Sequence, residues 1–337
     1  MSASPQGLPR RPALKPWYRL LPREDRLLLQ YGETLVSFEG RAARRLLPAL
    51  LPLLDGTRSL DEIVEIVGPP VRRAVEQALV LLHEHGLLTE AGTETLVEAE
   101  KRAGDFLAAT DPAGRSAVEL LETIRAASVA VAGSGSLALE VASSLRRSGA
   151  RTLEQLSLDA PSAELARFQL AVAVPEGEEL PTLSGWNQAA LTAALPWLQV
   201  LPFDGLFCAV GPLYVPGETA CYECFWIRRA SNVDYGREFL ALQEVAVRLP
   251  ASASLEQAVA GLAATLTLRW LAHADQFLAG TWYALELGTR PALGTHVLYR
   301  VPRCPVCSGL ARAAQPLPWH KAAQGDGVAS PTAEAAA

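Results

Sequence analysis

Residues 128–138 read SVAVAGSGSLA, a short apolar run followed at once by a glycine loop. Ser128–Ala132 predicts a buried strand, and residues 137–147 predict the helix that follows it. Further strands are predicted at 152–158 and 170–174, so strands and helices alternate along this part of the chain. Such alternation is typical of a parallel sheet with helical crossovers, and we therefore expect an α/β domain here.

The spacing of Gly133, Gly135 and Ala138 is that of the loop that cradles phosphate in nucleotide-binding folds. The residues around the loop do not support nucleotide chemistry. The chain has three lysines, none of them between residues 102 and 320, and Arg167 is the only basic residue from 152 to 200. Adenylyl transfer needs cations directed at the developing charge. We therefore interpret the loop as a retained turn with a vestigial cofactor site, and we do not expect ATP as a cofactor.

Two cysteine pairs give the strongest chemical signal in the chain. Cys221-x-x-Cys224 and Cys304-x-x-Cys307 can each direct two thiolates at one tetrahedral ion. Four sulfur ligands leave no open position for water, so we expect one structural Zn²⁺ and no catalytic metal. Cys208 lies in an apolar run and is interpreted as a small core residue.

Residues 15–90 predict a small unit of their own. One helix is expected after Gly40, a second is capped by Ser59 with Glu62 completing a capping box, and a third ends at Gly86. These helices follow strand-like runs at 15–21, 26–31 and 34–38. Three strands followed by three helices is the element order of a winged helix.

Composition indicates a globular protein of more than one domain. The 337 residues are 50% hydrophobic and carry a net charge of −6, which excludes a broadly basic nucleic-acid surface. The lack of a long apolar run and of a secretory signal predicts a cytoplasmic location. The expected divisions are a flexible arm (1–14), a winged-helix domain (15–90), a helical linker (91–115), a zinc-binding α/β domain (116–315) and a disordered tail (316–337).

Both halves resemble parts of one family. Residues 211–224 together with 303–307 resemble the zinc-bearing part of the ubiquitin-activating-like ThiF/MoeB superfamily, which implies a Rossmann-like fold. Residues 15–90, including the stretch 51–63, resemble the PqqD-like recognition element of enzymes that modify ribosomally made peptides (RiPPs). Their fusion is similar to the ocin-ThiF-like proteins, which bind leader peptides for YcaO cyclodehydratases that make thiazole/oxazole-modified microcins.

This resemblance implies a scaffold that is not itself catalytic. The leader of a precursor peptide would add as a strand to the edge formed by Thr34, Leu35, Val36, Ser37 and Phe38. The third helix would form the other wall of the groove, and its candidate contacts are Arg72, Arg73, Glu76, Gln77 and Val80. Plain solvent exposure is the alternative reading of these five side chains. Tethering the leader would present the peptide core to the YcaO partner for azoline formation, and a homodimer is the expected assembly.

Two other functions stay open at this stage. One is an ATP-dependent adenylating enzyme of the ThiF/MoeB class, although the chain shows no Asn-x-x-Arg-Gln segment and no matching catalytic lysine. The other is a winged-helix DNA-binding regulator. The first 88 residues hold 12 basic and 10 acidic side chains, which is not the charge balance of a DNA-binding surface.

Overall fold

The computed structural model describes residues 8–24, 26–90, 96–111, 113–288 and 290–308. Its N-terminal part contains a three-stranded antiparallel sheet in the order β2-β3-β4, in which β4 (Thr34–Glu39) is an edge strand. Within the predicted flexible arm, β1 (Pro12–Leu14) pairs antiparallel with β5 (Leu88–Glu90). The other elements of this part are β2 (Arg19–Pro22), β3 (Arg26–Tyr31), α1 (Gly40–Arg45), α2 (Leu47–Leu50), η1 (Leu51–Leu53), α3 (Leu60–Val67), η2 (Pro69–Val71) and α4 (Arg72–Glu84). The winged-helix assignment of this part stays a prediction.

Helix α3 begins as its sequence indicates. The Ser59 hydroxyl accepts the Glu62 N–H, and the Glu62 carboxylate accepts the Ser59 N–H at 2.7 Å. The single helix predicted after Gly40 is wrong, because three short helical segments, α1, α2 and η1, take its place. Pro48 and Pro52 each lie in the first turn of a new segment, and a proline inside a longer helix would remove a hydrogen bond and clash with the preceding turn.

The C-terminal part is organised around a seven-stranded mixed sheet in the order β12-β11-β10-β9-β8-β6-β7. Four strands are parallel, in agreement with the predicted alternation: β6 (Ser128–Ala132), β7 (Thr152–Leu156), β8 (Leu170–Ala173) and β9 (Trp197–Leu201). The expectation of a wholly parallel sheet is wrong, because three further strands are antiparallel: β10 (Phe207–Tyr214), β11 (Thr281–Glu286) and β12 (Ala292–Val297).

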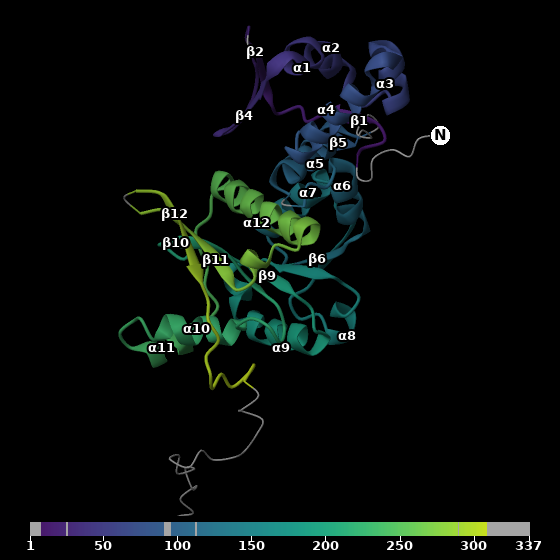
Figure 1. The fold of residues 1–337 in the computed structure, drawn as a ribbon. Coiled ribbons are helices and arrows are strands. Elements are labelled where there is room, and N and C mark those ends of the chain that lie inside the picture. Colours follow the sequence, from purple (N-terminus) through teal and green to yellow (C-terminus); the bar gives the residue numbers. More distant parts are fainter. Residues whose placement is uncertain (1–7, 25, 91–95, 112, 289, 309–337) are drawn as a thin grey trace, which may run out of the picture.

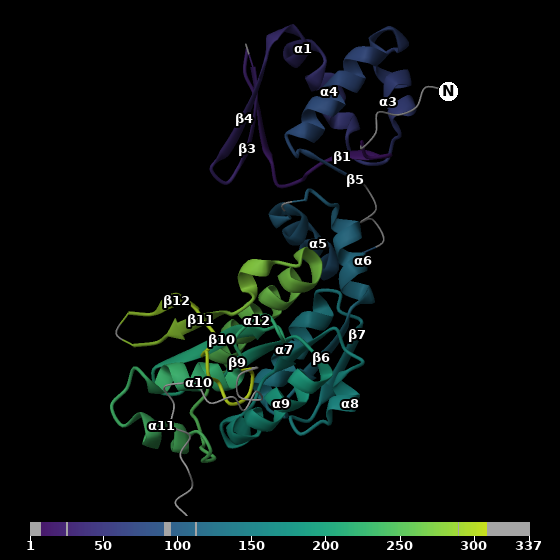
Figure 2. The ribbon, with the colours of Figure 1, turned by 60° about the horizontal axis from the view of Figure 1, so that its bottom comes forward.

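Helices cover both faces of this sheet (Figures 1 and 2). One face packs against α5 (Glu98–Thr110), α6 (Ala117–Ala126), α7 (Ser136–Arg147) and α12 (Ala253–His273). The other face packs against α8 (Ser162–Leu165), α9 (Leu183–Ala193) and α10 (Tyr222–Ala230). The remaining elements are η3 (Gly177–Thr182), α11 (Gly236–Leu242) and η4 (Gln276–Leu278).

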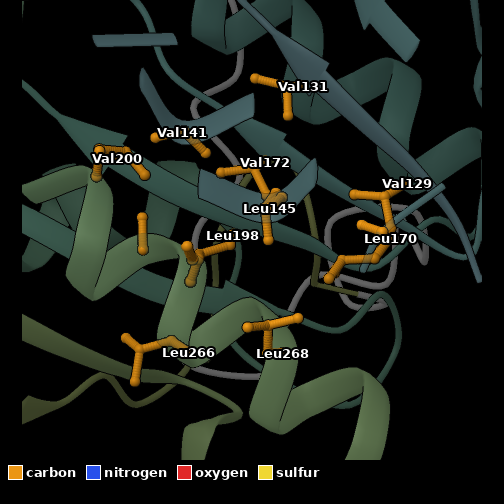
Figure 3. Packing of buried hydrophobic residues seen from close by; sticks show 14 of the residues in the cluster. Val129, Val131, Val141, Leu145, Leu170, Val172, Leu198, Val200, Leu266 and Leu268 are labelled. Carbon is orange, nitrogen blue, oxygen red and sulfur yellow. The ribbon is translucent and has the colours of Figure 1, made fainter. Parts of the chain in front are cut away.

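Figure 3 shows the larger core, in which valines and leucines of the parallel strands meet α7 and α12. Val131, Val172 and Val200 come from β6, β8 and β9, and each is fully buried. Leu107 of α5 is in the same cluster, so the helix inside the predicted linker contributes to this core. The predicted tail at 316–337 lies outside the described residues. Among those described, none of the helices has the length and apolar character that a membrane crossing requires.

A partly buried ion pair closes the turn between α5 and α6. The Asp111 carboxylate accepts the backbone N–H and the guanidinium of Arg115, each at 2.7 Å. The side chain of Asp111 is fully buried, and His273 of α12 lies 3.9 Å away. Burial alone would raise the pKa of Asp111, but the hydrogen bonds from Arg115 outweigh it and the pKa is lowered.

Candidate functional site

The four predicted cysteine ligands meet in one cluster. Cys221 caps the start of α10 and Cys224 lies in its first turn, whereas Cys304 and Cys307 follow β12. The Sγ atoms are separated by 3.9 Å in the pair Cys221–Cys224, 3.7 Å in Cys221–Cys304 and 3.5 Å in Cys224–Cys307, and all four lie within 4.8 Å of one another. A tetrahedral zinc with Zn–S bonds of about 2.3 Å needs sulfurs about 3.8 Å apart. The cluster is therefore compatible with a zinc site.

The surroundings of the cluster favour a closed structural site. Three of the thiols are buried and Cys307 is half-buried, so bulk water has little access. The backbone N–H of Val301 donates to the Cys224 sulfur at 3.4 Å, a contact of the kind that stabilises a metal-bound thiolate. Arg228 of α10 also donates to the carbonyls of Tyr299 and Arg300, so the same two segments are joined beside the cluster.

A second candidate site lies between the edge strand β4 and helix α4. Along β4, Leu35 is 61% exposed, Val36 is half-buried and Phe38 is buried. A cavity of about 400 Å³ lies elsewhere in the fold, but the cavity here is smaller, at about 180 Å³. It is lined by Phe38, Glu39, Leu46, Leu47, Ala74, Gln77, Ala78, Leu81 and Leu82. The lining is largely apolar, and it borders the edge of the three-stranded sheet.

The structure separates the predicted contacts on α4 into two groups. Gln77 lines the cavity, whereas Arg72, Arg73, Glu76 and Val80 do not. Arg72 forms ion pairs with Asp61 of α3 and with Glu76, so its charge is already partnered.

Three residues that line this cavity, Ala74, Ala78 and Leu81, are absent from the contacts predicted from the sequence. These residues are four and three positions apart, so they lie on one side of α4, next to its buried face. This spacing is the signal in the sequence that predicts them.

The glycine loop after β6 has the expected turn, but carboxylates surround it, whereas a phosphate-binding loop needs positive charge. Gly133 has φ of 133°, and a Cβ there would lie 2.0 Å from the carbonyl oxygen of Val174, so only glycine fits. A Cβ on Gly135 would lie 2.1 Å from a carboxylate oxygen of Glu176, which occupies the approach that a phosphate would use. Ala138 is buried against the sheet.

The two serines of this loop also bond to carboxylates. Ser134 donates to Glu179 and Ser136 donates to Glu256, each at 2.8 Å. Together with Glu176, these carboxylates place negative charge around the start of α7, where a nucleotide would need positive charge. The three carboxylates therefore oppose the binding of a phosphate group at this loop.

Comparisons with known proteins identify the fold. No protein-family model matches the chain, and no curated protein matches it in sequence. The solved structure of the heterocyclase TruD aligns with a TM-score of 0.69 and 24% identity, over 92% of this chain and 45% of TruD. A heterocyclase in complex with substrate and cofactor aligns with a TM-score of 0.69 and 22% identity, over 91% of this chain and 41% of that chain.

The microcin C7 biosynthetic enzyme MccB, solved with N-formylated MccA, aligns with a TM-score of 0.60 and 15% identity, over 88% of this chain and 99% of MccB. MccB of E. coli has also been solved with ATP. This chain thus spans less than half the length of the two heterocyclase chains and nearly all of MccB, and it shares their fold.

Proposed function

We propose that this chain binds the leader of a ribosomally made precursor peptide along β4 and presents the peptide core to a separate YcaO cyclodehydratase. The observation that carries the proposal is the outer edge of β4, with which no other described strand pairs, beside an apolar cavity that α4 completes. An edge strand offers unpaired N–H and C=O groups to an extended peptide, and a neighbouring cavity selects among its side chains. The fold shared with TruD and MccB supports this role, since MccB has been solved with the peptide MccA.

The proposal also assigns the steps of the reaction. We assign the ATP-dependent cyclodehydration to the YcaO partner, because carboxylates surround the glycine loop at which this chain would have to bind phosphate. In this proposal the zinc bound by the four cysteines holds α10 and the C-terminal segment together and takes no part in chemistry, because four thiolates leave no open position. An adenylating enzyme remains the second candidate, favoured by the MccB complex with ATP and opposed by the carboxylates at the glycine loop.

Titration of a fluorescent leader peptide onto the full chain tests the proposal. Leu81→Glu places a charge at the cavity and should weaken leader binding about tenfold or more, because an unpaired charge would face apolar side chains. Leu139→Glu on α7 is the matched control, since Leu139 is similarly exposed and lies outside the cavity. Val36→Pro should also weaken binding, because proline disturbs the backbone of the edge strand to which the leader would add.

Circular dichroism must show that each variant is folded. Equal leader affinity in the wild type, Leu81→Glu and Val36→Pro would show that the peptide does not bind at β4. Detection of ATP-dependent peptide modification by this chain alone would instead favour the adenylating enzyme.

A further inference from the structure

A further cavity lies apart from β4 and from the cluster of four cysteines. It has a volume of about 400 Å³ and lies where β6, β8 and β9 end and where α7 and α12 begin. In the sheet, β6 lies between β7 and β8. The chain runs from β6 to β7 on one side of it and then crosses to β8 on the other side. Ligands of open α/β sheets bind at this kind of switch point, and the volume suits a small molecule or one side chain.

The cavity has an apolar floor and a charged rim. Leu137, Cys208 and Val259 line it and are buried members of the main core. Glu178 and Glu256 line it as well and are accessible to solvent. Glu256 is held by the hydroxyl of Ser136 at 2.8 Å, so its carboxylate has a fixed position at the start of α7.

Residues 247–251 also border the cavity, and Arg248 in this segment is the one basic side chain among its described lining residues. The N–H of Val247 donates to the carbonyl of Gly177 at 3.3 Å, which holds residues 247–251 against the loop after β8. A Cβ on Gly177 would lie 2.2 Å from the carbonyl oxygen of Val247, so this close approach requires glycine. Arg248 of this segment lines the cavity together with three carboxylates, those of Glu176, Glu178 and Glu256, which leaves an excess of negative charge.

We propose that this cavity binds an aliphatic cation: the side chain of a peptide arginine or lysine, or a free alkyl amine or guanidine. The methylene stem would cover the apolar floor, and the cationic head would pair with the rim carboxylates. The same carboxylates exclude the phosphates that this position takes in nucleotide-binding folds. The proposal concerns a site distinct from β4 and does not depend on leader binding there.

Calorimetric titration of the full chain with agmatine tests the inference. Agmatine carries a guanidinium and a primary ammonium joined by an aliphatic stem and should bind. Butylguanidine, which keeps the guanidinium and the stem, should also bind, whereas guanidinium ion, which lacks the stem, should bind about tenfold more weakly than butylguanidine or worse. Glu256→Gln and Glu178→Gln should each weaken the binding of agmatine about threefold to tenfold, because each removes a carboxylate that pairs with the cation. Glu122→Gln on α6 is the matched control, because Glu122 is exposed and lies outside the cavity.

A variant that removes a positive charge from the lining should have the opposite effect on agmatine binding. Arg248→Gln removes the cation from the lining and should strengthen agmatine binding, and added salt should weaken agmatine binding to the wild type. Acetyl-arginine amide that binds more tightly than agmatine would assign the cavity to a peptide side chain, and the reverse order would assign it to a free amine or guanidine.

Three results would overturn the proposal. They are an absence of heat with millimolar agmatine in the wild type, equal affinity in the wild type and both glutamine variants, and tighter binding of ATP than of agmatine. None of these results bears on the titration of the leader at β4, so the two proposals can fail separately.

Discussion

If the four cysteines hold zinc as proposed, replacing Cys304 with serine should remove the metal and with it the stability of the C-terminal part of the chain. Cys304 is fully buried, and its Sγ lies 3.7 Å from that of Cys221, which is 83 residues away in sequence. Structural zinc contributes about 10–16 kcal/mol of binding free energy in small domains at neutral pH. A folded domain is stable by only about 5–15 kcal/mol, so loss of one of four ligands can abolish folding.

Metal analysis and thermal unfolding provide the assay. The wild type should hold one zinc per chain, and Cys304→Ser should be metal-free and insoluble or partly unfolded. Cys208→Ala is the control, since Cys208 is a buried free thiol of the main core and does not belong to the cluster of four cysteines. This control should retain its zinc and lose about 1–2 kcal/mol. A well-folded Cys304→Ser protein with normal zinc content, or a folded wild type with far less than one zinc per chain, would refute the reasoning.

Two predictions concern stability in other parts of the chain. Ser59→Ala removes the cap of α3 and should cost about 1 kcal/mol by urea unfolding; a loss near zero would show that the cap is dispensable. Hydrogen bonding to Ser59 lowers the pKa of Glu62, so the capping contribution should be present above the ordinary pKa of 4.5 and fade as the pH falls below it. Asp111→Asn should cost about 1–3 kcal/mol, less than for a fully buried pair because Arg115 is 37% exposed. The lowered pKa of Asp111 means that its stabilisation is lost on acidification below the ordinary value of 3.8, and a wild type whose stability is unchanged there would contradict this.

Local signals in the sequence predicted local structure well. The capping box at Ser59 and the parallel strands around β6 follow from residues that are close in sequence, and both are present. The cysteine cluster could also be predicted, because each pair carries its own spacing and only one partner pair exists in the chain. The prediction of one continuous helix after Gly40 overlooks the break at Pro48. The proline is the signal for this break, but the apolar periodicity continues across it.

Features built from distant segments could not be predicted in this way. The cavity at the start of α7 depends on residues 247–251, which have no regular periodicity and reach the cavity only through the fold. The carboxylate of Glu176 against Gly135 likewise depends on how the loop after β8 lies over the loop after β6. The sequence showed that cations are scarce near this loop, but it could not show that acids take their place.

The contacts of Trp17 bear on whether a peptide on β4 can be presented in a defined position. Trp17 packs against the main core, and its ring lies 6.1 Å from that of Tyr31, which pairs with Thr34 at the turn between β3 and β4. Lys15 lies 5.8 Å from the Trp17 ring, and burial lowers its pKa. The strands that would receive the leader are therefore joined to the main core of the C-terminal part by an aromatic contact as well as by the chain itself. A scaffold that presents a peptide core to a partner needs such a connection, because a freely rotating leader site would raise the local concentration of the core without orienting it.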